Sequence, residues 1–189
     1  SLNVYNHQTL RLLCEDGLDR LVLGTEQGRA LIDEFRASGV PLPELEIPVW
    51  GRLPLSYSAR CFTARALDLA KDDCGFRCIE YPDGLPLTSR DGRPFLTING
   101  IQTMSAHCYD LLDQIPGILA LGIDLVRISP QKEHLGTIIA AFDRARHGES
   151  FAPDRSGGSA SGLVNGHWFG GPGIVQHQPH ALEHAGACP

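Results

Sequence analysis

Short runs of apolar residues alternate along this chain with longer segments in which apolar positions recur every three or four residues. The short runs predict buried β-strands and the longer segments predict amphipathic helices. The expected strands cover residues 2–6, 20–24, 45–50, 95–99 and 125–129. The expected helices cover 8–16, 27–37 and 134–146, and a further helix contains 106–112. A β-hairpin is expected before 95–99, with its turn at Ser89-Arg90-Asp91-Gly92.

This alternation of strands and helices is typical of βα units. The segments 17–23 and 122–128 share the pattern Gly-apolar-Asp-x-apolar-apolar, in which a glycine ends a helix just before a buried strand. We count about four such units, whereas a closed eightfold barrel typically takes about 250 residues. The fold is therefore expected to be α/β, as half of a (β/α) TIM-like barrel or as an open sheet.

The composition indicates two regions. Residues 1–148 are expected to form the α/β unit, with a cysteine-rich loop over 51–81. Residues 149–189 are rich in Gly, Ser, Pro and His, and this composition is typical of a linker or mobile tail. The first expected strand begins at the very start of the sequence, which indicates a trimmed or partial chain.

Charge and cysteine content narrow the possible partners and location. The net charge is −6 and the sequence shows no basic stripe, so a nucleic-acid partner is not expected. No apolar stretch approaches the roughly 20 residues of a membrane span. The six cysteines occur without a visible secretory leader, which favours a reducing, cytoplasmic location. In that setting clustered cysteines bind metal or do chemistry more often than they form disulfides.

Three cysteines, Cys61, Cys74 and Cys78, lie in one irregular segment after the third expected strand. Thiolates are soft ligands that suit iron–sulfur clusters and zinc. Nearby cations favour thiolates and balance an anionic cluster; they are Arg60, Arg65, Lys71 and Arg77. The segment therefore predicts a metal site, and the alternative is that these cysteines are unrelated small core residues.

The spacing of the other candidate ligands excludes several kinds of site. Zinc ribbons use Cys-x2-Cys pairs, and the sequence has none. The last two clustered cysteines match the start of a radical-SAM motif, but Tyr81 stands where its third cysteine belongs. Cys14 and Cys108 are interpreted as packing residues and Cys188 as part of the tail. The segment 180–184 matches the His-x-x-Glu-His zinc-peptidase pattern, but its Gly- and Pro-rich surroundings do not favour the stable helix this motif requires.

The segments 51–65 and 71–78 strongly resemble the collagenase-like, U-type peptidase family. Further matches lie at 83–87, 95–103 and 127–131, and Asn165-Gly166-His167-Trp168 resembles a family signature that has Tyr in place of His167. The resemblance extends to about Gly173. Its cysteine block is similar to that of the members that act in ubiquinone biosynthesis.

The resemblance implies that the chain is the C-terminal half of a (β/α) barrel. It implies a [4Fe–4S] cluster bound by Cys61, Cys74, Cys78 and a fourth cysteine upstream of Ser1. The implied activity is oxygen-independent hydroxylation of ubiquinone precursors by a heterodimer with the paralogue UbiU. The lipid-binding accessory protein UbiT and prephenate, as oxygen donor, are implied as further partners. A functional peptidase is not expected, because no nucleophile–base arrangement is visible.

Two roles for the cluster remain open. The chain is either a catalytic subunit of the hydroxylase or a non-catalytic iron–sulfur scaffold or electron-transfer partner of the paralogue. A cluster with four thiolate ligands has no open iron for a substrate, which favours electron transfer or structural anchoring. Arg60, Arg65 and Arg127 are candidate contacts for a carboxylated donor, with structural ion pairing as the alternative. The sequence identifies no catalytic residue.

Overall fold

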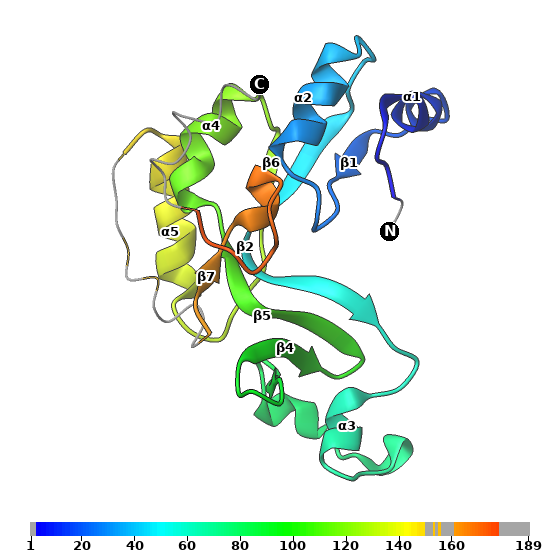
Figure 1. Cartoon of the computed structure of the whole chain (residues 1–189), viewed down its shortest axis with the longest axis vertical. Helices are drawn as coiled ribbons and strands as arrows, with labels where there is room; N and C mark the ends of the chain where they lie inside the picture. Colours follow the sequence, from blue (N-terminus) through cyan, green and yellow to red (C-terminus); the bar gives the residue numbers. More distant parts are fainter. Residues whose placement is uncertain (1–2, 150–152, 154, 156–160, 178–189) are drawn as a thin grey trace.

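A mixed β-sheet organises the molecule in the computed structural model, which describes residues 3–149, 153, 155 and 161–177 (Figure 1). Within these ranges the sheet has seven strands in the order β1-β2-β5-β4-β3, while β6 also pairs with β2 and β7 with β5. The strands are β1 (Arg20–Val22), β2 (Glu44–Tyr57), β3 (Leu85–Thr88), β4 (Pro94–Asn99), β5 (Gln102–Asp110), β6 (Leu125–Ile128) and β7 (Leu163–Val164).

Helices occupy the connections between these strands. The α-helices are α1 (His7–Glu15), α2 (Arg29–Ala37), α3 (Phe62–Ala66), α4 (Ile115–Ala120) and α5 (Leu135–Arg146). Short 3₁₀ helices are η1 (Lys71–Asp73), η2 (Arg77–Glu80), η3 (Leu112–Gln114) and η5 (Gly166–Phe169). The Asn6 side chain caps α1 by accepting a hydrogen bond of 2.8 Å from the Thr9 backbone N–H. No helix in the described ranges is long and apolar enough to cross a membrane.

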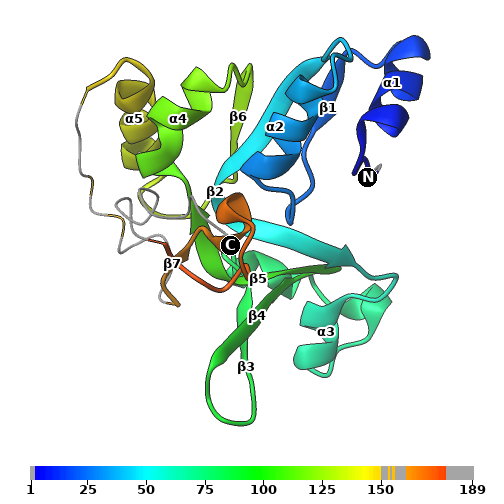
Figure 2. The ribbon, with the colours of Figure 1, turned by 45° about the horizontal axis from the view of Figure 1, so that its top comes forward.

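The long strand β2 belongs to two different arrangements. Its first part runs parallel to β1 and β6, with Leu45 beside Leu21 and Ile47 beside Val126. Its second part runs antiparallel to β5. In the sheet, β4 pairs with the other edge of β5, and β3 pairs with β4. We call β1, β6, residues 44–50 of β2 and helices α2, α4 and α5 the parallel half. We call residues 51–57 of β2, strands β3 to β5 and the segment 58–84 the antiparallel half (Figure 2).

The hydrophobic core lies in the parallel half. Alternate residues of β2, Leu45, Ile47 and Val49, are buried together with side chains of α2, α4 and α5. In α2, Ile32 and Phe35 are three positions apart on one helical face and both are fully buried. The rings of Trp50 and Phe142 pack edge to face with centroids 6.4 Å apart. Each large apolar side chain buried in this way stabilises the fold by about 1.5–3 kcal/mol.

Gly51 marks the point at which β2 passes from one half to the other. Its φ of +107° lies in a region that L-residues with side chains rarely adopt. A Cβ atom added here would lie 2.5 Å from the Cβ of Ser129, the residue just after β6. Glycine is therefore required both for the bend in β2 and for the close approach of the chain that leaves β6.

The structure confirms the α/β class, but the described sheet is open and is not closed into a barrel. Parallel pairing, as expected for half a barrel, joins β1 and β6 to β2 and β7 to β5, while the other pairs are antiparallel. The expected hairpin is present as β3 and β4, with the Gly92 N–H bonded to the Ser89 carbonyl oxygen. Most of the expected helices are present with small shifts in their bounds.

Two expected elements are wrong. The segment 106–112, expected as helix, belongs mostly to β5, because pairing with β2 on one side and β7 on the other outweighs local helix propensity. No strand forms over residues 3–6; Asn6 instead caps α1. In both cases a short apolar pattern fits either kind of element, and tertiary pairing or capping decides between them.

Part of the segment expected as tail is built into the fold. Strand β7 pairs in parallel with β5, and Val164 and Trp168 join the core. The Asn165 side chain accepts a hydrogen bond of 2.7 Å from the His177 N–H and donates one of 3.0 Å to its carbonyl oxygen. A Cβ on Gly28, at the start of α2, would lie 2.2 Å from the His167 carbonyl oxygen, so glycine is needed for this contact.

Candidate metal and ligand sites

The three clustered cysteines occupy the outer end of the antiparallel half. Cys61 caps α3 and its sulfur accepts a hydrogen bond from the Ala64 N–H at 3.4 Å. Cys74 follows η1, and Cys78 lies in η2. All three thiols are free and half-buried, and α3 packs against η2. The fold therefore places the three predicted ligands on one small substructure.

A sharp reversal of the chain connects the last two of these cysteines. Gly75 and Phe76 both have positive φ angles, +57° and +53°, so two consecutive residues adopt the left-handed conformation. For Phe76 this conformation costs about 1–2 kcal/mol. The Cys78 thiol points back along the turn and lies 3.7 Å from the Phe76 carbonyl oxygen. The turn therefore brings the Cys78 thiol close to the backbone of the residues that follow Cys74.

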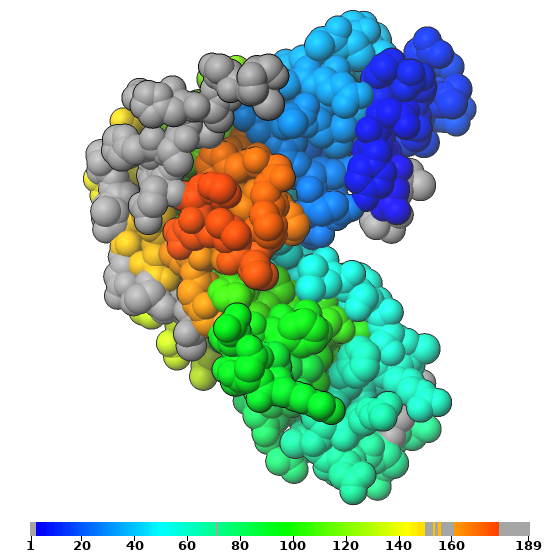
Figure 3. Space-filling view, in the orientation of Figure 1, coloured from blue at the N-terminus to red at the C-terminus, as the bar shows by residue number. Residues whose placement is uncertain are grey.

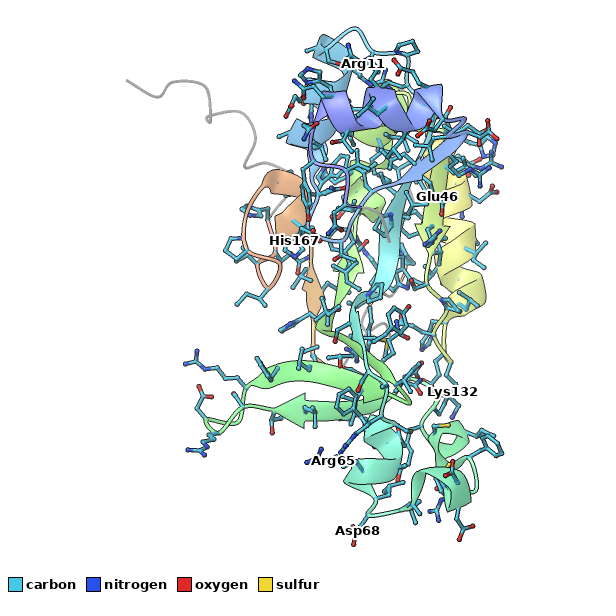
Figure 4. The ribbon with its side chains drawn as sticks, turned by 90° about the vertical axis from the view of Figure 1, so that its right-hand side faces the viewer. Arg11, Glu46, Arg65, Asp68, Lys132 and His167 are labelled. Atoms are coloured by element: carbon cyan, nitrogen blue, oxygen red, sulfur yellow. The ribbon has the colours of Figure 1, made fainter. Side chains whose placement is uncertain are left out.

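The substructure is attached to the sheet at both ends. At its start, the Thr63 hydroxyl accepts a hydrogen bond of 2.9 Å from the Gly100 N–H. At its end, an oxygen of Asp83 accepts one of 2.9 Å from the backbone N–H of Lys132, beyond β6 (Figure 4). Gly84 approaches β4 so closely that a Cβ would lie 2.6 Å from Thr97 Cγ2. The entry and exit of the segment are therefore fixed, while its outer turn is not packed into the core.

Among the described residues, no group of three or more His, Cys, Asp or Glu side chains is placed close enough to hold a metal ion. The donor set fits an iron–sulfur cluster in its chemistry, because it consists of three free thiols on one anchored segment. Its arrangement is open, and ligation would draw the thiols together. Cys61, Cys74 and Cys78 remain the predicted ligands.

Apolar side chains beside these cysteines are left uncovered. Phe76 and Ile79, on either side of Cys78, are 73% and 78% exposed. Phe95 on β4 and Tyr57 at the end of β2 are also largely exposed. Exposed large apolar side chains on both sides of a predicted ligand, as at Phe76 and Ile79, are typical of a binding surface.

The remaining cysteines do not extend this site. The Cys14 thiol lies 3.8 Å from the Pro41 carbonyl oxygen and packs against the core, where partial burial raises its pKa. Cys108 is fully buried within β5, and burial raises its pKa to about 12. The packing role predicted for both is confirmed. Cys188 and the segment 180–184 lie outside the described residues.

The three arginines predicted to bind a carboxylated donor do not converge. Arg127 lies in β6 and forms an ion pair of 2.7 Å with Glu46, which is only 8% exposed. Arg20 approaches the same carboxylate at 3.6 Å. Figure 4 shows Glu46 in the parallel half and Arg65 on α3 at the far end of the molecule. Arg127 therefore plays the structural ion-pairing role that was its alternative, and Arg60 and Arg65 are exposed on the cysteine segment.

A cleft separates the N-terminal elements from the antiparallel half. It has a volume of about 770 Å³, within the range of small-molecule sites. Its walls come from β1 with the loop after it, from both parts of β2 and from β6. Figure 3 shows the hollow between the N-terminal residues and the residues at the end of β2. The cleft exposes the face of the parallel sheet that carries Arg20 and Arg127.

A second, smaller cavity of about 290 Å³ adjoins the exit of the cysteine segment. It is lined by Arg52, Asp83, Asn99, Gln102 and Gln131, among others. Sequence reasoning missed Arg52, because a single arginine within an apolar strand has no distinctive spacing. The sequence also placed it in the loop expected over 51–81, whereas the structure places it in β2.

The comparison with known families agrees with the resemblance seen in the sequence. The model of peptidase family U32 matches residues 1–146. The chain belongs to this family. The matched range covers both halves of the sheet and the whole cysteine segment of this U32 protein. No solved structure matches the chain.

Proposed function

We propose that this U32 protein is the UbiV-type iron–sulfur subunit of an oxygen-independent hydroxylase of ubiquinone precursors. In this proposal Cys61, Cys74 and Cys78 bind a [4Fe–4S] cluster with a fourth cysteine upstream of Ser1. UbiU is the partner in a heterodimer, UbiT is the lipid-binding accessory protein and prephenate is the oxygen donor. The observation that supports the cluster is the gathering of three free thiols on one segment that is anchored at both ends.

In this proposal each predicted ligand has a distinct part in the site. Cys61 sits at the start of α3, where the backbone N–H of Ala64 can stabilise a bound thiolate. Cys74 and Cys78 flank the reversal at Gly75 and Phe76, so they can approach one centre from two directions. A cluster bound here would supply one-electron redox chemistry. The uncovered Phe76 and Ile79 would exclude water from it once a partner surface covers them.

Metal analysis of the full-length protein, purified without oxygen, tests the ligand assignment. We expect about four irons per chain and brown colour. Replacing Cys61, Cys74 or Cys78 by Ala should bleach the protein. Cys14→Ala and Cys108→Ala are matched controls, because both thiols serve packing, and they should keep the colour. Retained iron in the Cys74→Ala, Cys78→Ala double variant, or zinc alone in the wild type, would contradict the assignment.

Anaerobic quinone analysis tests the activity. A bacterium that lacks the gene should make ubiquinone in air, where oxygen-dependent hydroxylases act, and should accumulate precursors without ring hydroxyls when oxygen is absent. The intact gene should restore the quinone, and the variant with all three cysteines replaced should not. Wild-type ubiquinone levels in the anaerobic deletion strain would show that the proposed activity is wrong.

A non-catalytic role as iron–sulfur scaffold or electron-transfer partner of UbiU is the second candidate. The exposed Phe76 and Ile79 beside Cys78 favour it, because they offer an apolar contact surface next to the predicted cluster. Anaerobic reconstitution distinguishes the two roles. A scaffold should be needed to keep UbiU stable, but UbiU that was assembled beforehand should complete a single turnover of hydroxylation without it. A catalytic subunit should be needed both for the stability of UbiU and for that single turnover.

A further inference from the structure

We propose that the 290 Å³ cavity beside Arg52 binds a small organic molecule that carries a single carboxylate. The cavity lies between the exit of the cysteine segment, the β4–β5 turn and the chain that leaves β6. It shares no residue with the predicted cluster ligands. The inference therefore holds whether or not the cysteines bind iron.

Arg52 forms no ion pair with a carboxylate of the described residues, although the charge of Asp83 in the same cavity attracts it. Its Nη1 donates to the carbonyl oxygens of Ser105, at 3.0 Å, and of Ala106. Its Nε is buried without a hydrogen-bond partner, and no carboxylate forms an ion pair with Arg52 in the described part of the chain. Burial lowers the pKa of Arg52, although a guanidinium stays protonated in proteins. A bound anion would offset this cost of desolvation.

Two other arginines, exposed Arg127 in β6 and partly buried Arg155, show what is missing. Arg127 has the Glu46 carboxylate at 2.7 Å, and Arg155 has that of Asp110 at 2.8 Å. The protein thus compensates buried or strand-bound guanidinium groups with carboxylates elsewhere. At Arg52 the corresponding place is taken by a cavity. The two carbonyl contacts hold the guanidinium plane in position, which suits it to recognise a planar carboxylate.

The rest of the lining indicates the chemical class of the ligand. Pro54, Met104 and Pro130 provide apolar walls for a carbon skeleton. Asn99 and Gln102 add amide groups that can hydrogen-bond a ligand. The volume suits a molecule about the size of a substituted benzoate. An apolar body with one charged end matches this combination of walls.

Asp83 limits the ligand to one negative charge. Its carboxylate lines the same cavity and is held by the hydrogen bond from the Lys132 N–H. A dicarboxylate or phosphate would bring a second negative charge toward Asp83, and like charges in a site of reduced dielectric repel one another. The cavity should therefore prefer benzoate to malonate or inorganic phosphate.

Calorimetric titration of the full 189-residue chain with benzoate tests the proposal. Arg52→Gln should weaken binding at least about tenfold, because it removes a charge-assisted hydrogen bond. Asp83→Asn should tighten binding several-fold, because it removes the repulsive charge but keeps the oxygen that accepts from Lys132. Arg93→Gln is the matched control: Arg93 stands on the β3–β4 hairpin and its side chain is 83% exposed, so binding should not change.

The test is decisive because Arg52→Gln should weaken benzoate binding whereas Asp83→Asn should tighten it. Equal affinity in the wild type, Arg52→Gln and Asp83→Asn would overturn the proposal, and so would a wild type that does not bind benzoate. Arg52→Lys serves if Arg52→Gln does not fold, and it should lose most of the affinity because it lacks the planar fork. Malonate or phosphate binding as tightly as benzoate would overturn the single-charge specificity.

Discussion

The two halves of the sheet share strand β2 but are stabilised in different ways. In the parallel half, residues of β2 alternate with helix side chains in a continuous core that includes Leu45, Ile47, Phe35 and Phe142. In the antiparallel half, Leu53, Cys108 and Tyr109 extend this core from the strands next to the junction. Farther out, the buried side chains are mostly small, such as Thr63, Ala64 and Thr97. Backbone hydrogen bonds of the β3–β4–β5 meander and the anchors of the cysteine segment hold this half together.

This difference shows where an added ligand or partner would contribute most. The parallel half already buries a continuous set of large apolar residues, although Leu119, Val126 and Ile139 remain 41–49% exposed. The antiparallel half leaves Phe76, Ile79 and Phe95 in solvent and presents three unpaired thiols. Binding energy from a cluster or a partner surface would therefore appear as stability of this half.

The largest expected effect contrasts two phenylalanines. Phe35→Ala in α2 should lower the free energy of unfolding by about 3–5 kcal/mol, because it removes a fully buried ring and leaves a cavity. Phe76→Ala should change it by less than about 0.5 kcal/mol in the protein without cluster, because that ring is in solvent. Urea denaturation of both variants measures the contrast. Equal losses would show that the antiparallel half has a core of its own.

The junction between the halves should not tolerate a side chain at Gly51, which is buried. Gly51→Ala should destabilise by at least about 1–2 kcal/mol, because alanine is strained at its positive φ and its Cβ would meet Ser129. Gly92→Ala is the control: its φ is also positive, but no atom lies within 4 Å of the added Cβ. The difference between the two thermal denaturation midpoints isolates the close approach to Ser129. Identical midpoints would show that this approach carries no cost.

The parallel half was predictable because its signals are local. The apolar faces of α2 and α5, and the glycines at 17 and 122 that precede strands β1 and β6, are visible in the sequence. Strand β5 was not predictable, because Gln102–Asp110 becomes a strand through pairing with β2 and β4, which lie elsewhere in the chain. The contribution of Trp168 to the core was hidden by the Gly- and Ser-rich sequence before it.

The two candidate sites differ in the same way, because one was visible from a local signal and the other depends on tertiary structure. The cysteine segment was found from the spacing of three residues of one type, and that signal needs no tertiary information. The Arg52 cavity joins residues from β2, the Asp83 loop and the chain after β6, and none of them is close to the others in sequence. Only the fold shows that Arg52 is buried beside a cavity and that Arg127 is already paired with Glu46.

The smallest expected effect concerns Cys108, the fully buried thiol of β5, and takes the form of a pH dependence of stability. Burial raises the pKa of Cys108 from 9.0 to about 12. Above pH 9 the unfolded chain releases this proton while the folded protein keeps it, so the folded state binds more protons and loses stability as pH rises. The loss approaches about 1.4 kcal/mol per pH unit at its steepest. Below pH 9 both states hold the proton and the contribution is constant.

Urea denaturation at pH 7.5, 9 and 10 measures this slope. Cys108→Ala should remove it, while Cys78→Ala, which alters a half-buried thiol on η2, should retain it. The comparison uses the change with pH rather than the absolute free energy of unfolding, because Cys108→Ala also leaves a small cavity in β5. Tyrosine and lysine side chains titrate in the same range, but they are present in both variants and cancel. An equal slope in both variants would mean that Cys108 ionises in the folded protein as readily as a thiol in solvent.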